Sequence, residues 1–461
     1  MLKLMNNSLN SEKTENNRLG TMPIGRLIVY MSVPTMFSML IQALYNIVDS
    51  IFVSHYSELA LTAVSLAFPL QTLMISFAVG MSVGICSVIS RRLGAGKPEE
   101  AFRAGETGYI IQLCLTAVFI AVGLFLSRPF LGLYTNDAEL LELSATYACI
   151  CLGIGIGVFI SVFCEKTIQA TGDTFHPMVI QAAGAIVNII LDPILIFGYL
   201  GLPSMGVAGA AYATVAGQLF SMCLGLFFLR RNRYVSISLL HPRWSRKSAS
   251  DIFSVGFPAV VMQGIGTIMT SLMNGILISF NVLATTVFGV YFKLQSFVFM
   301  PVFGMNSGLM PILGFNYGAQ NRARMLKTLR LGLVFAFLFM TAGSLVFITV
   351  PDALLGLFNA SPAMMAIGEV ALRRIAVTFP LAAISILLGA LFQAIGDGYL
   401  SMIVSIVRQV FILIPCAWLL GRLYGLDAVW FSFLVAEIVA LTMSLLFYRK
   451  ELKKLDFAGQ Y

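Results

Sequence analysis

The apolar blocks of this chain restrict its fold more than any other feature. Charged residues stand in clumps, and between them run apolar blocks of about 20 to 28 residues, the length that an α-helix needs to cross a bilayer core. Only 11% of the 461 residues are charged, whereas soluble domains carry about 25%. The mean hydropathy is +0.89. Because helices satisfy their own backbone polar groups in lipid, the pattern predicts an all-α integral membrane protein.

The blocks divide into twelve predicted transmembrane helices. We place them near residues 26–54, 60–88, 105–127, 143–165, 177–200, 206–229, 250–279, 283–313, 329–350, 367–391, 399–421 and 426–448. An even number of spans leaves both termini on the same side of the membrane.

The positive charge of the chain indicates its orientation. All but six of the 29 Lys and Arg residues fall on the side that carries the termini. The exceptions are Arg128, Lys293, Arg373, Arg374, Arg408 and Arg422. Because positive residues accumulate in cytoplasmic loops, we expect both termini to be cytoplasmic. The formal net charge of +8 is explained by this topology, and no nucleic-acid partner is expected.

The two halves of the chain repeat each other at an offset of 224 residues. GMSVG at 80–84 aligns with GMNSG at 304–308, and QATGD at 169–173 aligns with QAIGD at 393–397. Matches at Gly, Gln and Asp in one register indicate a duplication. Each half holds an even number of spans, six, so a pseudo-two-fold axis along the membrane normal relates two six-helix bundles. This plan is typical of transporters, with the substrate path between the halves.

The repeat sets the predicted domain boundaries. We expect a disordered cytoplasmic tail (1–22), an N-terminal six-helix lobe (23–230), a cytoplasmic linker (231–249), a C-terminal six-helix lobe (250–450) and a cytoplasmic tail (451–461). The seven cysteines all lie within apolar blocks, where cysteine packs as a small apolar residue. Neither a disulfide nor a metal framework is expected.

Polar residues near the end of the first span form one part of a candidate site. Asp49 lies about 9 Å from the outer end of this span, counting back from His55. Gln42, Tyr45 and Asp49 recur at helical spacing and share one face. An aspartate side chain is too short to reach far toward the membrane surface, so this position is either a wet interfacial residue or a functional group.

The fifth span carries a second carboxylate at similar depth. Asn188 and Asp192 are four residues apart and share one helical face. Two carboxylates in one low-dielectric cavity cannot both stay ionised cheaply, so we expect the Asp49–Asp192 pair to hold one proton or one monovalent cation, with oxygens of Asn188 and Gln42 assisting. The alternative is a structural pair that pins two helices. Intramembrane acids usually face a working cavity, which favours the functional interpretation.

The second half carries charges at other positions. Lys293, Arg408 and Glu437 fall in spans 8, 11 and 12, and Glu437 aligns with Gln218 at an offset of 219. These residues are expected to form a static ion-pair network or to act in substrate binding and gating. Glu165 and Lys166, at the end of span 4, are expected to be solvated or to cap the helix. The chain has no phosphate-binding loop, so we expect an ion gradient to drive transport, with no cofactor and no catalytic residue.

Together these residues resemble the MATE family, the multidrug and toxic compound extrusion transporters. The resemblance covers the chain from about Arg26 to Lys454. It is carried by LYNIVDSIFV in span 1, QATGDT at 169–174, NIILDPILIFG in span 5 and FMPVFGMNSGLMPILGFNYGA at 299–319, the last being most similar to the MepA-like bacterial branch. The resemblance implies two lobes that alternate access to the two sides of the membrane.

The resemblance also implies roles for individual residues. Asp49, Gln42, Tyr45, Asn188 and Asp192 match residues that are linked to cation coupling in family members. One branch places further coupling acids in spans 7 and 10, but this chain has none at mid-depth there. Glu437 is the candidate substitute for them.

We therefore expect a secondary antiporter, not an enzyme, in the bacterial cytoplasmic (inner) membrane. It would act as a monomer in contact with membrane lipid and export small amphipathic organic cations, including antibiotics, in exchange for H⁺ or Na⁺. The alternative is a flippase for lipid-linked oligosaccharides, of the same wider superfamily, with Lys293, Arg408, Arg373 and Arg374 as a basic groove. An intramembrane enzyme is disfavoured, because the sequence shows no catalytic cluster.

Overall fold

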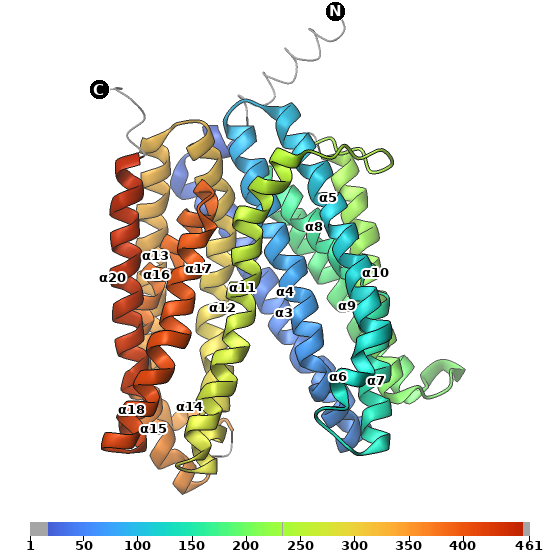
Figure 1. Cartoon of the computed structure of the whole chain (residues 1–461), viewed down its shortest axis with the longest axis vertical. Coiled ribbons are helices and arrows are strands. Elements are labelled where there is room, and N and C mark those ends of the chain that lie inside the picture. Colours follow the sequence, from blue (N-terminus) through green and yellow to red (C-terminus); the bar gives the residue numbers. More distant parts are fainter. Residues whose placement is uncertain (1–16, 233, 359, 455–461) are drawn as a thin grey trace, which may run out of the picture.

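The computed structural model describes residues 17–232, 234–358 and 360–454, which form two helical lobes (Figure 1). The N-terminal lobe contains α3 (Ile24–Tyr56), α4 (Glu58–Gly94), α5 (Pro98–Ala121), the π-helical η1 (Val122–Leu126), α6 (Ser127–Leu131), α7 (Ala138–Gly153), α8 (Ile156–Ala170), α9 (Phe175–Phe197), η2 (Tyr199–Gly201) and α10 (Gly206–Arg231). The C-terminal lobe contains α11 (Arg246–Ile278), α12 (Val282–Gly318), α13 (Arg322–Thr349), α14 (Pro351–Gly356), α15 (Pro362–Ala376), α16 (Phe379–Ile395), α17 (Gly398–Ile406), the π-helical η3 (Val407–Leu413), α18 (Ile414–Tyr424), α19 (Leu426–Val429) and α20 (Phe431–Lys454).

The number of candidate spans agrees with the prediction. Within the described ranges, ten helices are long and apolar enough to cross a membrane. Two bent helix pairs, α7–α8 and α15–α16, bring the number to twelve when each pair is counted as one span. The predicted all-α membrane architecture is confirmed.

The duplication extends to helix ends and bends. The helices α4 and α12 begin at Glu58 and Val282 and end at Gly94 and Gly318, so both ends differ by the same offset of 224. The α7–α8 pair bends by 45° and its counterpart α15–α16 by 48°. A shared sequence register thus produces the same helix lengths and the same break in both lobes.

The end of the predicted N-terminal tail differs from the expectation of disorder. Residues 1–16 lie outside the described residues, but Arg18–Thr21 form a short helix, α2, with Leu19 fully buried. Asn17 donates a hydrogen bond from Nδ2 to the carbonyl of Thr171 over 3.3 Å, and Asn316 donates from Nδ2 to the carbonyl of Leu19 over 3.3 Å. This segment therefore contacts both lobes, because one apolar side chain and two backbone carbonyls find partners there.

The other boundaries shift by a few residues. The linker is shorter than 231–249, because α10 ends at Arg231 and α11 begins at Arg246. The helix α20 continues to Lys454, so it includes the start of the predicted tail 451–461, and residues 455–461 lie outside the described part of the chain.

Repeated glycines bring the two lobes into backbone contact. A Cβ atom on Gly308 of α12 would lie 2.6 Å from the carbonyl oxygen of Met31 in α3. Its repeat counterpart, Gly84 of α4, likewise packs directly on the carbonyl of Ile252 in α11. Any side chain at these positions would push the helices apart, which explains why glycine recurs at this point of GMSVG and GMNSG.

Polar bonds between the lobes lie at the same end of the molecule. Arg92 of α4 forms an ion pair of 2.7 Å with Asp251 of α11. Lys166 of α8 donates from Nζ to the Ser307 Oγ of α12 over 2.7 Å. The expectation that Lys166 is solvated or caps its helix therefore differs from the structure, which places its ammonium group between the lobes.

These contacts give the molecule one closed end. They involve the N-terminal half of α3 and the C-terminal half of α4, next to the chain termini. Figure 1 shows that the ribbons of the two lobes meet there and diverge toward the opposite end. The structure thus corresponds to a state that is closed on the side of the termini.

We expect Asp251→Asn to weaken the closed end, because Arg92 would lose its ionised partner. Spin labels on Arg103→Cys and Lys327→Cys, two exposed positions related by the repeat, would report the separation of the lobes by pulsed electron paramagnetic resonance. The exposed Cys114 and Cys223 would be replaced by Ser in this background. The expected result is a second, longer distance population.

The matched control is Glu142→Gln, which removes the exposed ion pair with Arg128. It should leave the distance distribution unchanged. An Asp251→Asn distribution identical to that of the parent protein would show that the ion pair does not hold the lobes together.

Candidate functional site

The two predicted carboxylates come together inside the N-terminal lobe. Asp192 of α9 is 0% exposed, and Asn188, one turn earlier, is 2% exposed. Asp49 of α3 is half-buried, and its carboxyl group interacts directly with that of Asp192. The equal depth that the sequence predicts for the two acids is therefore matched by lateral contact between α3 and α9.

Neighbouring polar groups hold the pair in place. Asn188 donates from Nδ2 to Asp192 Oδ1 and to Thr214 Oγ1 of α10, in both cases over 3.4 Å. The Tyr45 side chain also contacts Thr214 and lies within electrostatic range of both carboxyl groups. Three helices therefore contribute to one cluster, to which we refer as the acid cluster (Tyr45, Asp49, Asn188, Asp192 and Thr214).

Several oxygens of the acid cluster are buried without a hydrogen-bond donor. They are Asp49 Oδ1, Asn188 Oδ1 and Asp192 Oδ2, none of which has a partner in the described chain. A buried polar atom without a partner is unfavourable by about 1–3 kcal/mol. Three such oxygens from two acids and an amide form a set of acceptors that a proton or a small cation would satisfy.

Aromatic and thiol groups close the site on the side of α7. Tyr147 and Cys151 are buried and lie within electrostatic range of Asp49. Neither of them was predicted as a site residue, and Thr214 was also missed. A Thr or a Tyr inside an apolar span looks like ordinary packing, so the sequence gives little signal for these positions.

Gln42 lies on the predicted face of α3 but has a different partner. Gln181 of α9 donates from Nε2 to Gln42 Oε1 over 3.3 Å. The pair stands nearly two turns away from Asp49 along α3, toward the closed end. Its contact thus links the same two helices as the acid cluster, at a separate level.

The four charged or polar residues of the second predicted group do not form one site. Arg408 and Glu437 form an ion pair of 3.1 Å, in which Glu437 is 6% exposed and its Oε1 has no partner in the described chain. Lys293 is exposed, and its Nζ lies 6.0 Å from the Phe358 ring centroid. Gln218 belongs to α10 of the other lobe.

The Arg408–Glu437 pair sits at an irregular stretch of helix. Arg408 belongs to the π-helical segment η3, and Glu437 belongs to α20. Such segments are frequent at functional sites. The geometry nevertheless differs from that of the acid cluster, because here one acid is neutralised by a guanidinium rather than paired with a second acid.

Comparisons with known proteins agree with this two-lobe architecture. The MatE family profile matches residues 34–194 and 258–419, once in each lobe. The multidrug export protein MepA of Staphylococcus aureus is 25% identical over 429 residues, which cover 92% of this chain and 94% of that protein. An FAD transporter of Shewanella oneidensis is 26% identical over 397 residues, covering 86% of this chain and 88% of that protein.

A solved structure shows the same fold. It is described as the outward-facing conformation of a multidrug resistance MATE family transporter of the MOP superfamily. It matches with a TM-score of 0.87 at 26% identity, covering 97% of this chain and 98% of that one. The fold and the comparisons together define a multi-pass membrane transporter and not an enzyme. The chain belongs to the MATE family of multidrug efflux transporters.

We expect Thr214→Val to destabilise the acid cluster by about 1 kcal/mol, because Asn188 would lose one of its two hydrogen-bond acceptors. Thermal unfolding of the purified protein in detergent would show a lower melting temperature. Thr214→Ser is the matched control, because it keeps the hydroxyl and removes only a methyl group. A variant series in which Val is neutral and Ser is destabilising would contradict the assignment of the hydroxyl to this network.

Proposed function

We propose that this chain is a secondary antiporter that exports amphipathic organic cations in exchange for H⁺ or Na⁺. Asp49 and Asp192 would be the coupling carboxylates, with Asn188 and Thr214 as neutral ligands or positioning groups and Tyr45 beside them. The observation that carries this proposal is the buried Asp49–Asp192 contact with unpartnered oxygens. Two acids that face each other in a low-dielectric site need a shared proton or a bound cation.

The chemistry of the cluster favours a proton or a small monovalent cation. Carboxylate and amide oxygens are hard ligands, suited to hard cations. A Ca²⁺ site would need six to eight oxygens, more than the three unpartnered oxygens of the acid cluster. One monovalent cation or one proton lowers the net charge of the pair from two to one, which relieves the repulsion between the carboxylates.

The closed end indicates from which side of the membrane the coupling ion would enter. By the positive-inside rule the termini lie in the cytoplasm, so the structure would be outward-facing. The acid cluster lies on α3 beyond the interlobe contact at Met31, toward the open end. In this state H⁺ or Na⁺ would enter from outside, and its binding would replace the charge interaction that holds a cationic substrate and so release the substrate outward.

The distribution of basic residues favours organic cations over a pyrophosphate cargo. Of the four residues that a basic groove would need, Arg408 is paired with Glu437, Arg373 with Glu369, and Arg374 donates to the carbonyl of Asp427. These guanidinium groups already have acceptors. The acid cluster, in contrast, provides negative charge that no basic residue of the described part of the chain pairs with.

The cellular setting follows from topology and from the relatives. We propose a protein of the bacterial cytoplasmic membrane with both termini in the cytoplasm, acting as a monomer and contributing to resistance against toxic cations. The cargo would be amphipathic and cationic, because the carboxylates of the acid cluster attract positive charge.

Liposome transport would test the coupling. Purified protein would be reconstituted with ethidium inside the vesicles, and a pH gradient or a Na⁺ gradient would be imposed separately. Gradient-driven dye movement is expected for the parent protein with one of the two ions. It should be lost in Asp49→Asn and in Asp192→Asn, because the amide keeps the shape of the carboxyl group but carries no negative charge and takes up no proton.

Asp352→Asn is the matched control, because Asp352 is exposed at the start of α14. This variant should transport like the parent. Wild-type transport rates in both Asp49→Asn and Asp192→Asn would mean that the pair is a structural contact between α3 and α9.

The cargo class can be tested by competition in the same vesicles. We expect organic cations such as ethidium to compete with each other, and FAD, an anion, not to compete, because the acid cluster repels negative charge. Transport of FAD without transport of ethidium would contradict the proposed cargo. Growth of a flippase-deficient strain rescued by this chain, without resistance to dyes, would instead favour the lipid-linked oligosaccharide alternative.

A further inference from the structure

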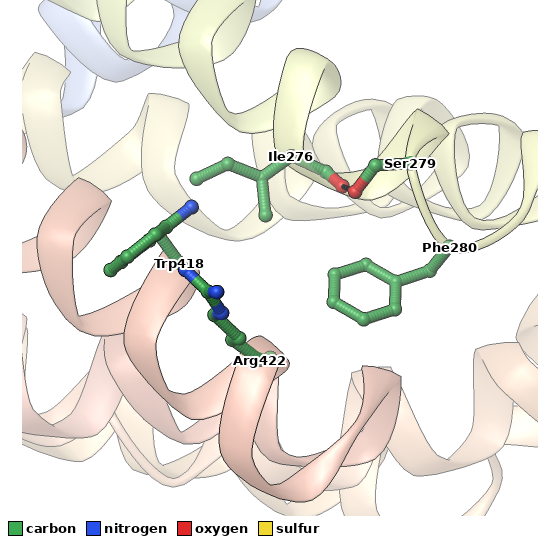
Figure 2. Close-up of a pocket in the computed structure, with 6 residues that line it drawn as sticks. Ile276, Ser279, Phe280, Trp418 and Arg422 are labelled. Carbon is green, nitrogen blue, oxygen red and sulfur yellow. Dashed lines mark hydrogen bonds between the residues drawn. The ribbon is translucent and has the colours of Figure 1, made fainter.

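A cavity of about 420 Å³ lies between α11 and α18, at the end of the C-terminal lobe away from the termini (Figure 2). Its lining residues are Ile276, Ser279, Phe280, Trp418, Gly421 and Arg422. Ser279 and Phe280 directly follow the end of α11, whereas Trp418, Gly421 and Arg422 share one face of α18. The volume falls within the range of about 300–1,000 Å³ that is usual for small-ligand sites.

The cavity contains a cation without an anionic partner. Arg422 lies two residues before the end of α18, and its guanidinium group stands 5.4 Å from the centroid of the Trp418 ring. Within the described ranges, Arg422 forms no ion pair and no hydrogen bond. Arg128, at the same end of the molecule, is by contrast paired with Glu142 over 3.2 Å.

The remaining walls of the cavity are amphipathic. The Phe280 and Trp418 side chains are 40% and 52% exposed, and beside them the Ser279 hydroxyl donates to the Ile276 carbonyl over 2.6 Å. Figure 2 shows Ile276, Phe280, Trp418 and Arg422 arranged around a common space between the two helices. Tryptophan and arginine at helix ends are typical of the membrane–water interface, so the cavity opens at the level of lipid headgroups.

The duplicated position in the N-terminal lobe is filled. By the offset of 224, Phe280 corresponds to Tyr56 and Gly421 to Phe197, and these two rings pack with centroids 6.3 Å apart. A Cβ atom on Gly421 would lie 2.8 Å from the ring of Phe280. In the C-terminal lobe the Phe280 ring packs directly on the backbone of Gly421, so a larger side chain at position 421 would not fit beside it.

An apolar track continues from the cavity toward the middle of the membrane. Ile268 and Leu272 of α11 are exposed and lie on the same face as Ile276, at intervals of four residues. Phe411 of η3 is 65% exposed and lies two turns from Trp418. A headgroup at Arg422 would thus be followed by apolar surface for an acyl chain, which a free phosphate ion would not use.

We propose that this cavity binds the headgroup of an anionic glycerophospholipid from the outer side of the membrane. The guanidinium group of Arg422 donates hydrogen bonds to the phosphodiester oxygens, and the two aromatic rings cover the glycerol region. Lipid binding at this site does not depend on the transported cargo or on the coupling ion.

Tryptophan fluorescence tests the site directly, because Trp418 forms one of its walls. The three tryptophans are Trp244, Trp418 and Trp430. Trp244→Phe removes an exposed emitter, and Trp430, which is fully buried, can stay. The protein would be reconstituted in vesicles that contain brominated phosphatidylglycerol or brominated phosphatidylcholine as the quencher, in otherwise identical lipid.

Stronger quenching by phosphatidylglycerol than by phosphatidylcholine is expected, and it should disappear in Trp418→Phe. Arg422→Gln should reduce the preference by about fivefold, the effect of one basic residue on anionic lipid. Ser279→Phe, which fills the cavity at an exposed position, should reduce quenching by both lipids. Arg128→Gln is the matched control and should keep the preference.

Equal quenching by the two lipids would overturn the proposal, as would a preference that survives Arg422→Gln. Displacement of the brominated lipid by inorganic phosphate would also overturn it, because the site would then recognise the free anion. Since the readout involves no transport, failure of this proposal is distinguishable from failure of the proposed antiport.

Discussion

Close backbone contact between the two lobes at one end of the molecule governs the arrangement of everything else. Gly84 and Gly308, which occupy the same place in the two repeats, let α4 and α3 touch the partner lobe without a side chain between them. The Arg92–Asp251 pair and the Lys166–Ser307 bond add polar contacts at this end. At the opposite end the ribbons of the two lobes diverge (Figure 1).

The two bundles have similar helices because of the duplication, but they differ in their buried polar side chains. The N-terminal lobe holds two acids in contact, which we propose share one proton or bind one cation. The C-terminal lobe holds the Arg408–Glu437 pair, which is neutral as a unit. At the far end, Tyr56 packs against the Phe197 ring in the N-terminal lobe, whereas the Phe280 ring packs on the backbone of Gly421 in the C-terminal lobe. Each lobe thus uses one common helical frame for a different kind of polar chemistry.

Much of this could be predicted from the sequence, because the signals are local. The length of the apolar blocks predicted the transmembrane helices, and the sequence repeat at an offset of 224 predicted the two bundles. The meeting of Asp49 and Asp192 followed from their equal depth. Contacts that depend on how helices rotate against each other could not be predicted. Thr214 faces Asn188 although it resembles an ordinary polar residue in an apolar span. The Lys166 side chain lies between the lobes. Residues 17–22 contact both lobes, and their partner in the C-terminal lobe is Asn316, almost 300 positions away.

The most direct test of the acid cluster is infrared difference spectroscopy of the purified protein, which detects the C=O stretch of a protonated carboxyl group. The account predicts a protonated-carboxyl band that changes when pH is raised or Na⁺ is added. This band should be lost when Asp49 and Asp192 are both replaced by Asn. A spectrum of the double variant that shows the same band and the same response would contradict it, because the proton or cation would then bind elsewhere.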